Sequence, residues 1–112
     1  MERVLHPALP SDPGHQIWKR DFLGGSGLFT LELKSIGHPA LVRFFESLEL
    51  FGIGLSWGGY ESLALSIDKL PTRVASRTTY QNSLIRIHVG LENIDNLKHD
   101  MTRAFSFMAA AC

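Results

Sequence analysis

The strongest constraint on the fold is an alternation of residue types, broken only by Leu84, over the eight positions from Leu84 to Leu91. One set of alternate positions is entirely apolar: Ile85, Ile87, Val89 and Leu91. The other set carries Leu84, Arg86, His88 and Gly90. Side chains in a strand point alternately to opposite faces, so this pattern predicts a strand with one buried face. An apolar sheet face has to be covered, and helices are the expected cover.

Two amphipathic helices are predicted to provide that cover. The first begins at Gly37-His38-Pro39, because proline is well placed at a first helical position, and it ends near Phe51 and Gly52. Its apolar stripe has helical spacing and consists of Leu41, Phe44, Phe45 and Leu48. The second begins near Asn93, a good N-cap residue. Its stripe consists of Ile94, Leu97, Met101, Ala104, Phe105 and Met108.

The remaining elements complete one small domain over residues 1–112. Residues 1–14 are expected to form a loop, followed by a short helix over His15–Phe22 and a glycine turn. Strands are predicted over Leu28–Lys34 and over part of Leu55–Ile67, where glycines interrupt the second one. The result is an α+β domain, with helices packed on one face of a small antiparallel sheet. The other face would be partly uncovered and would carry Arg86 and His88.

Composition excludes several classes of function. The chain is 45% hydrophobic and 20% charged, as in ordinary soluble domains, and its formal net charge is zero. No basic run suggests nucleic-acid binding, and no apolar run reaches the roughly 18 residues of a membrane span. The N-terminus lacks the apolar segment of a signal peptide. The single cysteine, Cys112, cannot form an internal disulfide, so the expected compartment is the reducing cytoplasm.

Arg86 is the sharpest candidate for a binding residue. It lies in mid-strand between Ile85 and Ile87, and a rigid strand suits the two-pronged contact of a guanidinium with a carboxylate. The alternative is a solvated arginine on an exposed sheet face. For His88 the simplest interpretation is a polar residue of the same face. The five histidines form no i, i+4 pair and have no cysteine partners, so their spacing does not support a metal site.

The segment from Gly54 to Leu63 is unusual for a strand. Gly58 and Gly59 stand beside Trp57, and paired glycines in a strand mark a bulge or a close backbone approach. This indicates that the backbone accommodates another group, and that group can lie outside this chain. Ser56 could be a nucleophile in principle, but the Gly-x-Ser-x-Gly elbow of hydrolases is absent around it.

Several segments, taken in order, resemble one known family. They are His6-Pro7-Ala8-Leu9-Pro10, Gly14-His15, Trp18-Lys19-Arg20-Asp21-Phe22, Gly27-Leu28-Phe29, Ser56-Trp57-Gly58-Gly59-Tyr60-Glu61-Ser62 and Leu84 to Glu92. Together they resemble the C-terminal domain of the pyridoxal-phosphate (PLP) enzymes of cysteine and methionine metabolism, in particular the cystathionine β-lyase branch. The γ-synthases and γ-lyases of the family typically carry leucine where Trp57 stands and lack the Trp-Lys-Arg-Asp-Phe pattern.

The resemblance implies a fold, a reaction and a set of substrate-binding residues. The fold would be that of the C-terminal domain of fold-type I PLP-dependent transferases. The reaction would be α,β-elimination of cystathionine or a related thioether amino acid. Arg86 would bind the substrate α-carboxylate, Ser56 and Trp57 would lie near it, and Leu55 would border the side-chain end of the substrate. The preferred sulfur amino acid stays open, because the position of Leu55 varies in the family.

The resemblance also implies that the larger, PLP-binding domain is missing. The lysines are Lys19, Lys34, Lys69 and Lys98, and none stands in a context resembling the family's cofactor-binding segment. The chain would then be a C-terminal domain by itself: a fragment, a truncated gene product or a deliberately made piece. It would bind no PLP, contain no catalytic residue and be inactive alone. The alternative is a non-catalytic α+β module or a gene product without a role. Absence of the larger domain would leave surface exposed around Trp57 and Phe22 and favour self-association, whereas the alternative module could dimerise through the uncovered sheet face.

Overall fold

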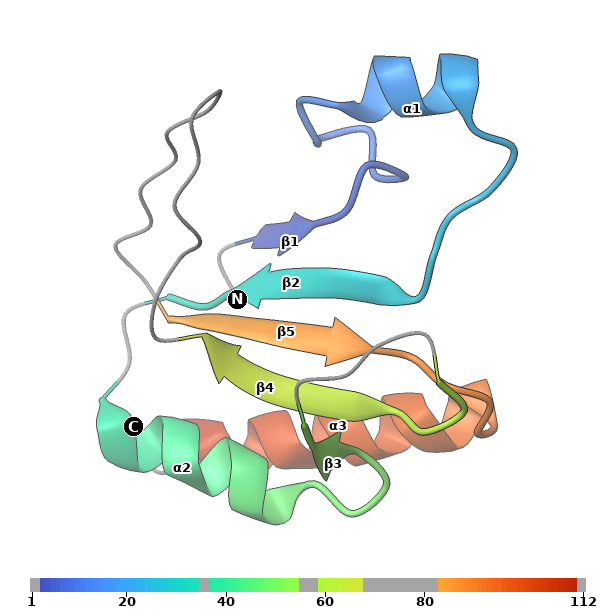
Figure 1. Cartoon of the computed structure of the whole chain (residues 1–112). Helices are drawn as coiled ribbons and strands as arrows, with labels where there is room; N and C mark the ends of the chain where they lie inside the picture. The colour runs from blue at the N-terminus through green and yellow to red at the C-terminus, as the bar shows by residue number, and fades with distance from the viewer. Residues whose placement is uncertain (1–2, 35–36, 55–58, 68–82, 111–112) are drawn as a thin grey trace.

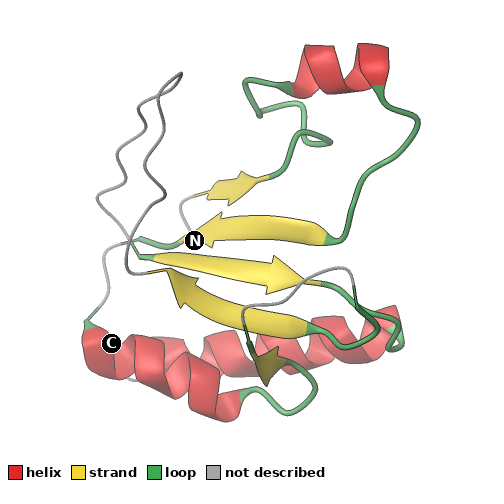
Figure 2. Cartoon of the chain, in the orientation of Figure 1, coloured by secondary structure: helices red, strands yellow, loops and turns green. Residues whose placement is uncertain are grey.

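The computed structural model describes residues 3–34, 37–54, 59–67 and 83–110 (Figures 1 and 2). Its elements, in chain order, are β1 (Arg3–Leu5), α1 (His15–Asp21), β2 (Leu28–Glu32), α2 (His38–Ser47), β3 (Gly52–Ile53), β4 (Leu63–Ile67), β5 (Leu84–His88) and α3 (Ile94–Ala110).

The five strands form one sheet in the order β1-β2-β5-β4-β3. All neighbouring strands are antiparallel except β3 and β4, which run parallel. The strand with the clearest alternation, β5, lies at the centre. Its Arg86 is opposite Thr30 of β2 and Leu65 of β4. The predicted α+β class is confirmed.

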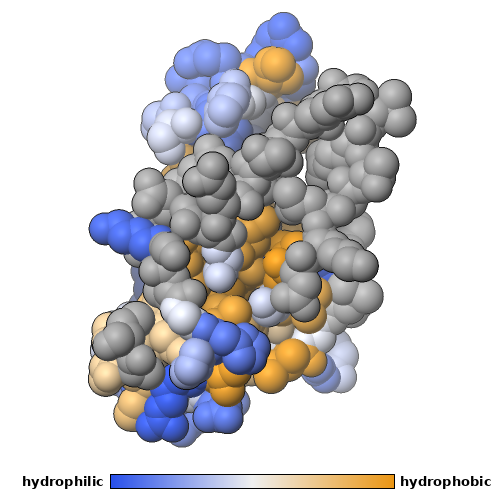
Figure 3. Space-filling model, turned by 90° about the vertical axis from the view of Figure 1, so that its left-hand side faces the viewer, coloured by the Kyte–Doolittle hydropathy of each residue, from blue (hydrophilic) through white to orange (hydrophobic). Residues whose placement is uncertain are grey.

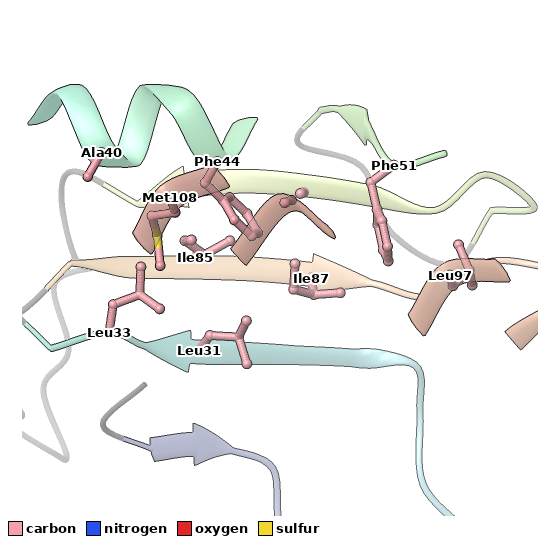
Figure 4. Close-up of a cluster of buried hydrophobic side chains, with 11 residues drawn as sticks. Leu31, Leu33, Ala40, Phe44, Phe51, Ile85, Ile87, Leu97 and Met108 are labelled. Carbon is pink, nitrogen blue, oxygen red and sulfur yellow. The ribbon is translucent and has the colours of Figure 1, made fainter. Parts of the chain in front are cut away.

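Helices α2 and α3 pack against each other and cover one face of the sheet (Figure 1). The core lies between the two layers, and its side chains point from the helices and the strands toward one another (Figure 4). Phe44 of α2 is fully buried there, as are Ile85 and Ile87 of β5. The alternation of residues 84–88 therefore sets which side of the sheet the helices cover.

The ends of the two long helices follow the sequence signals. Pro39 lies in the first turn of α2. The Asn93 side-chain oxygen accepts hydrogen bonds from the backbone N–H groups of Asp95 (2.9 Å) and Asn96 (3.2 Å). This is the N-cap geometry expected at the start of α3.

Two short strands were missed by the sequence interpretation. Residues 1–14 were predicted to be a loop, but Arg3–Leu5 form β1 against β2. The two residues of β3 pair with β4 in parallel, whereas only antiparallel pairing was predicted. Neither strand is long enough to show an alternation, and both form only because a longer strand offers them free backbone groups.

The sheet face opposite the helices is less open than predicted. Arg86 and Thr30 are half-buried on it, but Glu32, Leu84 and His88 are buried. His88 is buried where the chain at Gly59 returns to the end of β5. An alternating pattern cannot indicate such a return, because it comes from a segment about 30 residues away.

Helix α1 lies apart from the layer of α2 and α3, beyond the β1 edge of the sheet (Figure 1). Seen from the side, hydrophilic residues lie around α1 and among the helices, and apolar side chains show between them at the level of the sheet (Figure 3).

None of the helices in the described part of the chain has the length and apolar character needed to cross a membrane.

Candidate functional site

Arg86 projects from the middle of the central strand, on the face opposite the helices. Its backbone is held in register on both sides, by β2 at Thr30 and by β4 at Leu65. The residue as a whole is half-buried. A guanidinium on such a rigid base can hold a carboxylate in one orientation. The carboxylate-binding role of Arg86 stays a prediction.

The other three predicted substrate-binding residues, Leu55, Ser56 and Trp57, lie outside the described residues. Both described ends of their segment are attached to the sheet. The Gly54 N–H donates to the Ala64 carbonyl oxygen of β4 at 3.3 Å. The Gly59 carbonyl oxygen accepts a hydrogen bond from His88 Nε2 of β5 at 3.0 Å.

His88 joins β5 to the chain at Gly59 and is not simply a polar residue of the sheet surface. It is only 8% exposed, and it lies two positions from Arg86 on the same strand. Because a carbonyl oxygen only accepts hydrogen bonds, Nε2 carries the proton in this contact. The other ring nitrogen, Nδ1, is buried with no hydrogen-bond partner among the described residues.

The pairing of the buried Ser62 with the half-buried Glu92, beside His88, was not identified from the sequence. Ser62 is 1% exposed, and both its N–H (3.0 Å) and its hydroxyl donate to the Glu92 carboxylate. The hydroxyl oxygen also accepts from the Gly90 N–H at 2.8 Å. The Ser62 hydroxyl, followed by the Ser62 N–H, lowers the pKa of Glu92 below its ordinary 4.5. No sequence pattern predicts a contact between two polar residues that are 30 positions apart.

A second buried acid, Asp100, was also missed, although a signal existed. It stands among the apolar positions of α3, three residues after the buried Leu97, and is 3% exposed. Its carboxylate accepts from the N–H groups of Glu49 (2.9 Å), Leu50 (2.9 Å) and Phe51 (3.4 Å). It therefore fixes the turn that follows α2 and has a structural role.

The described residues do not form a site that fits PLP. The family's cofactor needs an enclosed lysine amine, but Lys19, Lys34 and Lys98 are all exposed and lie in three separate parts of the fold. Lys69 lies outside the described residues. Over the same ranges, no group of three His, Cys, Asp or Glu side chains could hold a metal ion.

One pocket lies between α1 and the glycine turn before β2, with a volume of about 380 Å³. Its walls include Ile17, Trp18, Phe22 and Leu28. The Trp18 indole N–H donates to the Gly24 carbonyl oxygen at 3.1 Å. The pocket is thus mainly apolar, and the polar group of its tryptophan is already paired within the chain.

Comparison with known proteins agrees with the arrangement of these elements. Cystathionine beta-lyase MetC of Escherichia coli is 42% identical over 93% of this chain, and the match spans 27% of that protein. Cystathionine gamma-lyase of Sus scrofa is 36% identical over 93% of the chain, again spanning 27% of the relative. This chain therefore matches little more than a quarter of the length of these relatives.

A solved structure shows the same fold. Cystathionine gamma synthase from Xanthomonas oryzae, in complex with aminoacrylate and cysteine, matches 99% of this chain with a TM-score of 0.82 and 26% identity. The match covers 30% of that chain. The sequence model of the Cys/Met metabolism PLP-dependent enzymes matches residues 1–106. The resemblance inferred from the sequence is thereby confirmed, and the chain belongs to the family of Cys/Met metabolism PLP-dependent enzymes.

Proposed function

We propose that this chain is the substrate-orienting C-terminal domain of a PLP-dependent carbon–sulfur lyase of the cystathionine β-lyase type. The substrate would be cystathionine or a related thioether amino acid. The observation that carries the proposal is Arg86, half-buried in mid-strand β5 and held in register by β2 and β4. The identity of 42% to the E. coli cystathionine beta-lyase supports the choice of branch.

In this proposal the chain contributes orientation and not bond cleavage. A carboxylate held by two parallel hydrogen bonds from Arg86 cannot rotate, so the bonds at the neighbouring carbon take one direction in space. Fixing a reacting group in this way accounts for a real part of catalysis. The cofactor and its lysine would belong to a larger domain outside these residues, because the described lysines do not fit that role.

A chimera tests the proposal. This chain would replace the matching 27% of the E. coli cystathionine beta-lyase MetC, and lyase activity would be measured with L-cystathionine. We expect the chimera to retain PLP and release the thiol product, and the chain alone to do neither. PLP mixed with the chain alone should give diffuse, non-saturating labelling of exposed lysines.

Two results would contradict this assignment. One is a chimera that retains PLP but has no activity. The other is a stoichiometric absorbance band of lysine-bound PLP in the chain alone, lost when a single lysine is replaced. PLP retention by the chimera serves as the control for its folding.

Self-association is a second property that we expect of the isolated chain. Apolar side chains gather at α1 and just after it: Ile17 is 58% exposed, Phe22 is 63% exposed and Leu23 is fully exposed. Exposed apolar groups beside an apolar pocket tend to be covered by association. Analytical ultracentrifugation should therefore detect dimers or larger species.

A matched pair of substitutions locates the contact. Leu23→Ser should shift the equilibrium toward monomer, whereas Leu91→Ser, at a leucine that is 85% exposed on another part of the surface, should leave it unchanged. A chain that stays monomeric at high concentration would show that this surface does not associate with itself.

A further inference from the structure

The contacts between residues 59–62 and the end of β5 form a compact hydrogen-bonded group, which we call the Ser62–Glu92 cluster. Its members are Gly59, Tyr60, Ser62, His88, Gly90, Leu91 and Glu92. Besides the bonds of Ser62 and His88 described above, the Leu91 N–H donates to the Tyr60 carbonyl oxygen at 2.9 Å. The cluster thus joins two chain segments through both backbone and side-chain groups.

The cluster is closed by a close backbone approach at Gly90. A Cβ atom added there would meet the carbonyl group of Tyr60 and would lie 2.7 Å from the Glu61 carbonyl carbon. Backbone atoms cannot yield as a flexible side chain can, so only glycine fits at this position. The glycine lets residues 60–62 lie directly against the end of β5.

The polar groups of the cluster have few alternative hydrogen-bond partners. Ser62 is buried and uses its hydroxyl as donor and acceptor at once. The buried His88 ring makes one hydrogen bond among the described residues, to Gly59. Because the Ser62 and His88 side chains are buried, leaving either of them without its partner is costly. The cluster therefore holds the Gly59 backbone in one place relative to β5.

The position of Gly59 relative to β5 matters because β5 carries Arg86 and because the segment 55–58 ends directly before Gly59. Arg86 is two residues before His88 on the same strand. Gly59 is the residue that directly follows the segment 55–58 in the chain. Gly54, at the other end of the segment, is held by Ala64 of β4. The cluster thus fixes Gly59 against the strand that carries Arg86.

We propose that His88, Ser62 and Glu92 are positioning residues for carboxylate binding: they hold the chain at Gly59 in register with Arg86 without touching the substrate. The inference rests on the proposed role of Arg86 as the carboxylate-binding residue. It adds residues that set the affinity of that site through the backbone, and it assigns a purpose to the polar cluster around the buried Ser62 and His88.

The test uses the 112-residue chain and two readouts by nuclear magnetic resonance. Amide hydrogen exchange at Ser62, Gly90 and Leu91 reports whether the cluster is closed. Titration with L-cystathionine, followed at the Arg86 guanidinium resonances, reports carboxylate binding. In the unmodified chain we expect the three amides to be protected and the titration to saturate.

The substitutions remove or keep the hydrogen bond of His88. His88→Met deletes the donor, whereas His88→Gln places an amide N–H near the position of Nε2. We expect His88→Met to speed exchange at the cluster amides and to weaken L-cystathionine binding about fivefold, the effect of losing one hydrogen bond. His88→Gln should restore both. Ser62→Ala should have the same two effects as His88→Met. The test therefore does not depend on the methionine variant folding correctly.

Ser47→Ala is the matched control for Ser62→Ala. Ser47 is also a buried serine with a hydrogen-bonded hydroxyl, donated to the Arg43 carbonyl oxygen at 2.7 Å, but it lies on α2. It should change neither readout at the cluster.

The possible results separate the two proposals. Faster exchange at the cluster with unchanged L-cystathionine affinity would overturn the positioning role while leaving Arg86 in place. Unprotected cluster amides in the unmodified chain would also overturn it. Absence of a saturable Arg86 response, with the cluster amides protected, would overturn the carboxylate site and, with it, the positioning role.

Discussion

Replacing Arg86 with alanine is expected to lower kcat/KM of the chimera severely while leaving the fold intact. Losing a partly buried charge pair costs about 2–5 kcal/mol. That corresponds to a decrease of roughly 30- to several-thousand-fold in kcat/KM. The fold should survive, because Arg86 lies on the face opposite the core and the neighbouring Ile85 and Ile87 supply the buried contacts. Steady-state kinetics with L-cystathionine measures the loss, and thermal melts check the fold.

Two further variants show whether the loss is specific. Arg86→Lys should recover only part of the activity, because an ammonium group cannot reproduce the two-pronged guanidinium contact. Arg20→Ala is the matched control, since Arg20 is an exposed arginine of α1 that pairs with the neighbouring Asp21. Its effect should stay within about 0.5 kcal/mol. Near-normal turnover in a stably folded Arg86→Ala chimera would show that Arg86 is only a surface charge.

The largest expected effect on stability comes from Asp100. Asp100→Ala leaves the N–H groups of Glu49, Leu50 and Phe51 without their acceptor and removes a partner 3.2 Å from Arg103 Nη2. A buried polar group left unpaired costs about 1–3 kcal/mol, and of these three N–H groups that of Phe51 is buried whereas those of Glu49 and Leu50 are partly buried. We expect the free energy of unfolding to fall by about 2–4 kcal/mol. Urea unfolding followed by circular dichroism measures it.

The contribution of Asp100 should also depend on pH. Burial raises the pKa of Asp100, but hydrogen bonds from Glu49, Leu50 and Arg103 outweigh it and hold the pKa below the ordinary 3.8. A lowered pKa in the folded state means that the stabilisation is complete above the unfolded value and disappears as pH falls through the folded value. The difference in stability between the unmodified chain and Asp100→Ala should therefore narrow below about pH 4.

Asp95 provides the control for both measurements. It is an exposed aspartate in the first turn of the same helix, α3. Its removal should cost only about 0.3–1 kcal/mol through the helix dipole. An equal loss for Asp95→Ala and Asp100→Ala would mean that the hydrogen bonds of Asp100 add nothing to stability.

The sequence by itself determined the layers of the fold and the candidate carboxylate-binding residue. The alternation at residues 84–88 specified a strand with one buried face, and the helical stripes specified what covers it. Arg86 could be singled out because a charged residue in mid-strand contrasts with its direct neighbours. These features are local, and local periodicity records which side of an element is buried.

Only the tertiary structure decided how distant polar groups meet. The Ser62–Glu92 cluster joins segments about 30 residues apart, and Asp100 reaches backbone groups about 50 residues away. The short strands β1 and β3 likewise exist only because β2 and β4 lie beside them. A hydrogen bond depends on the position of both partners in space, and a sequence pattern describes only one of them at a time. The face around Arg86 that sequence patterning left partly uncovered is therefore closed over His88 by the returning chain at Gly59.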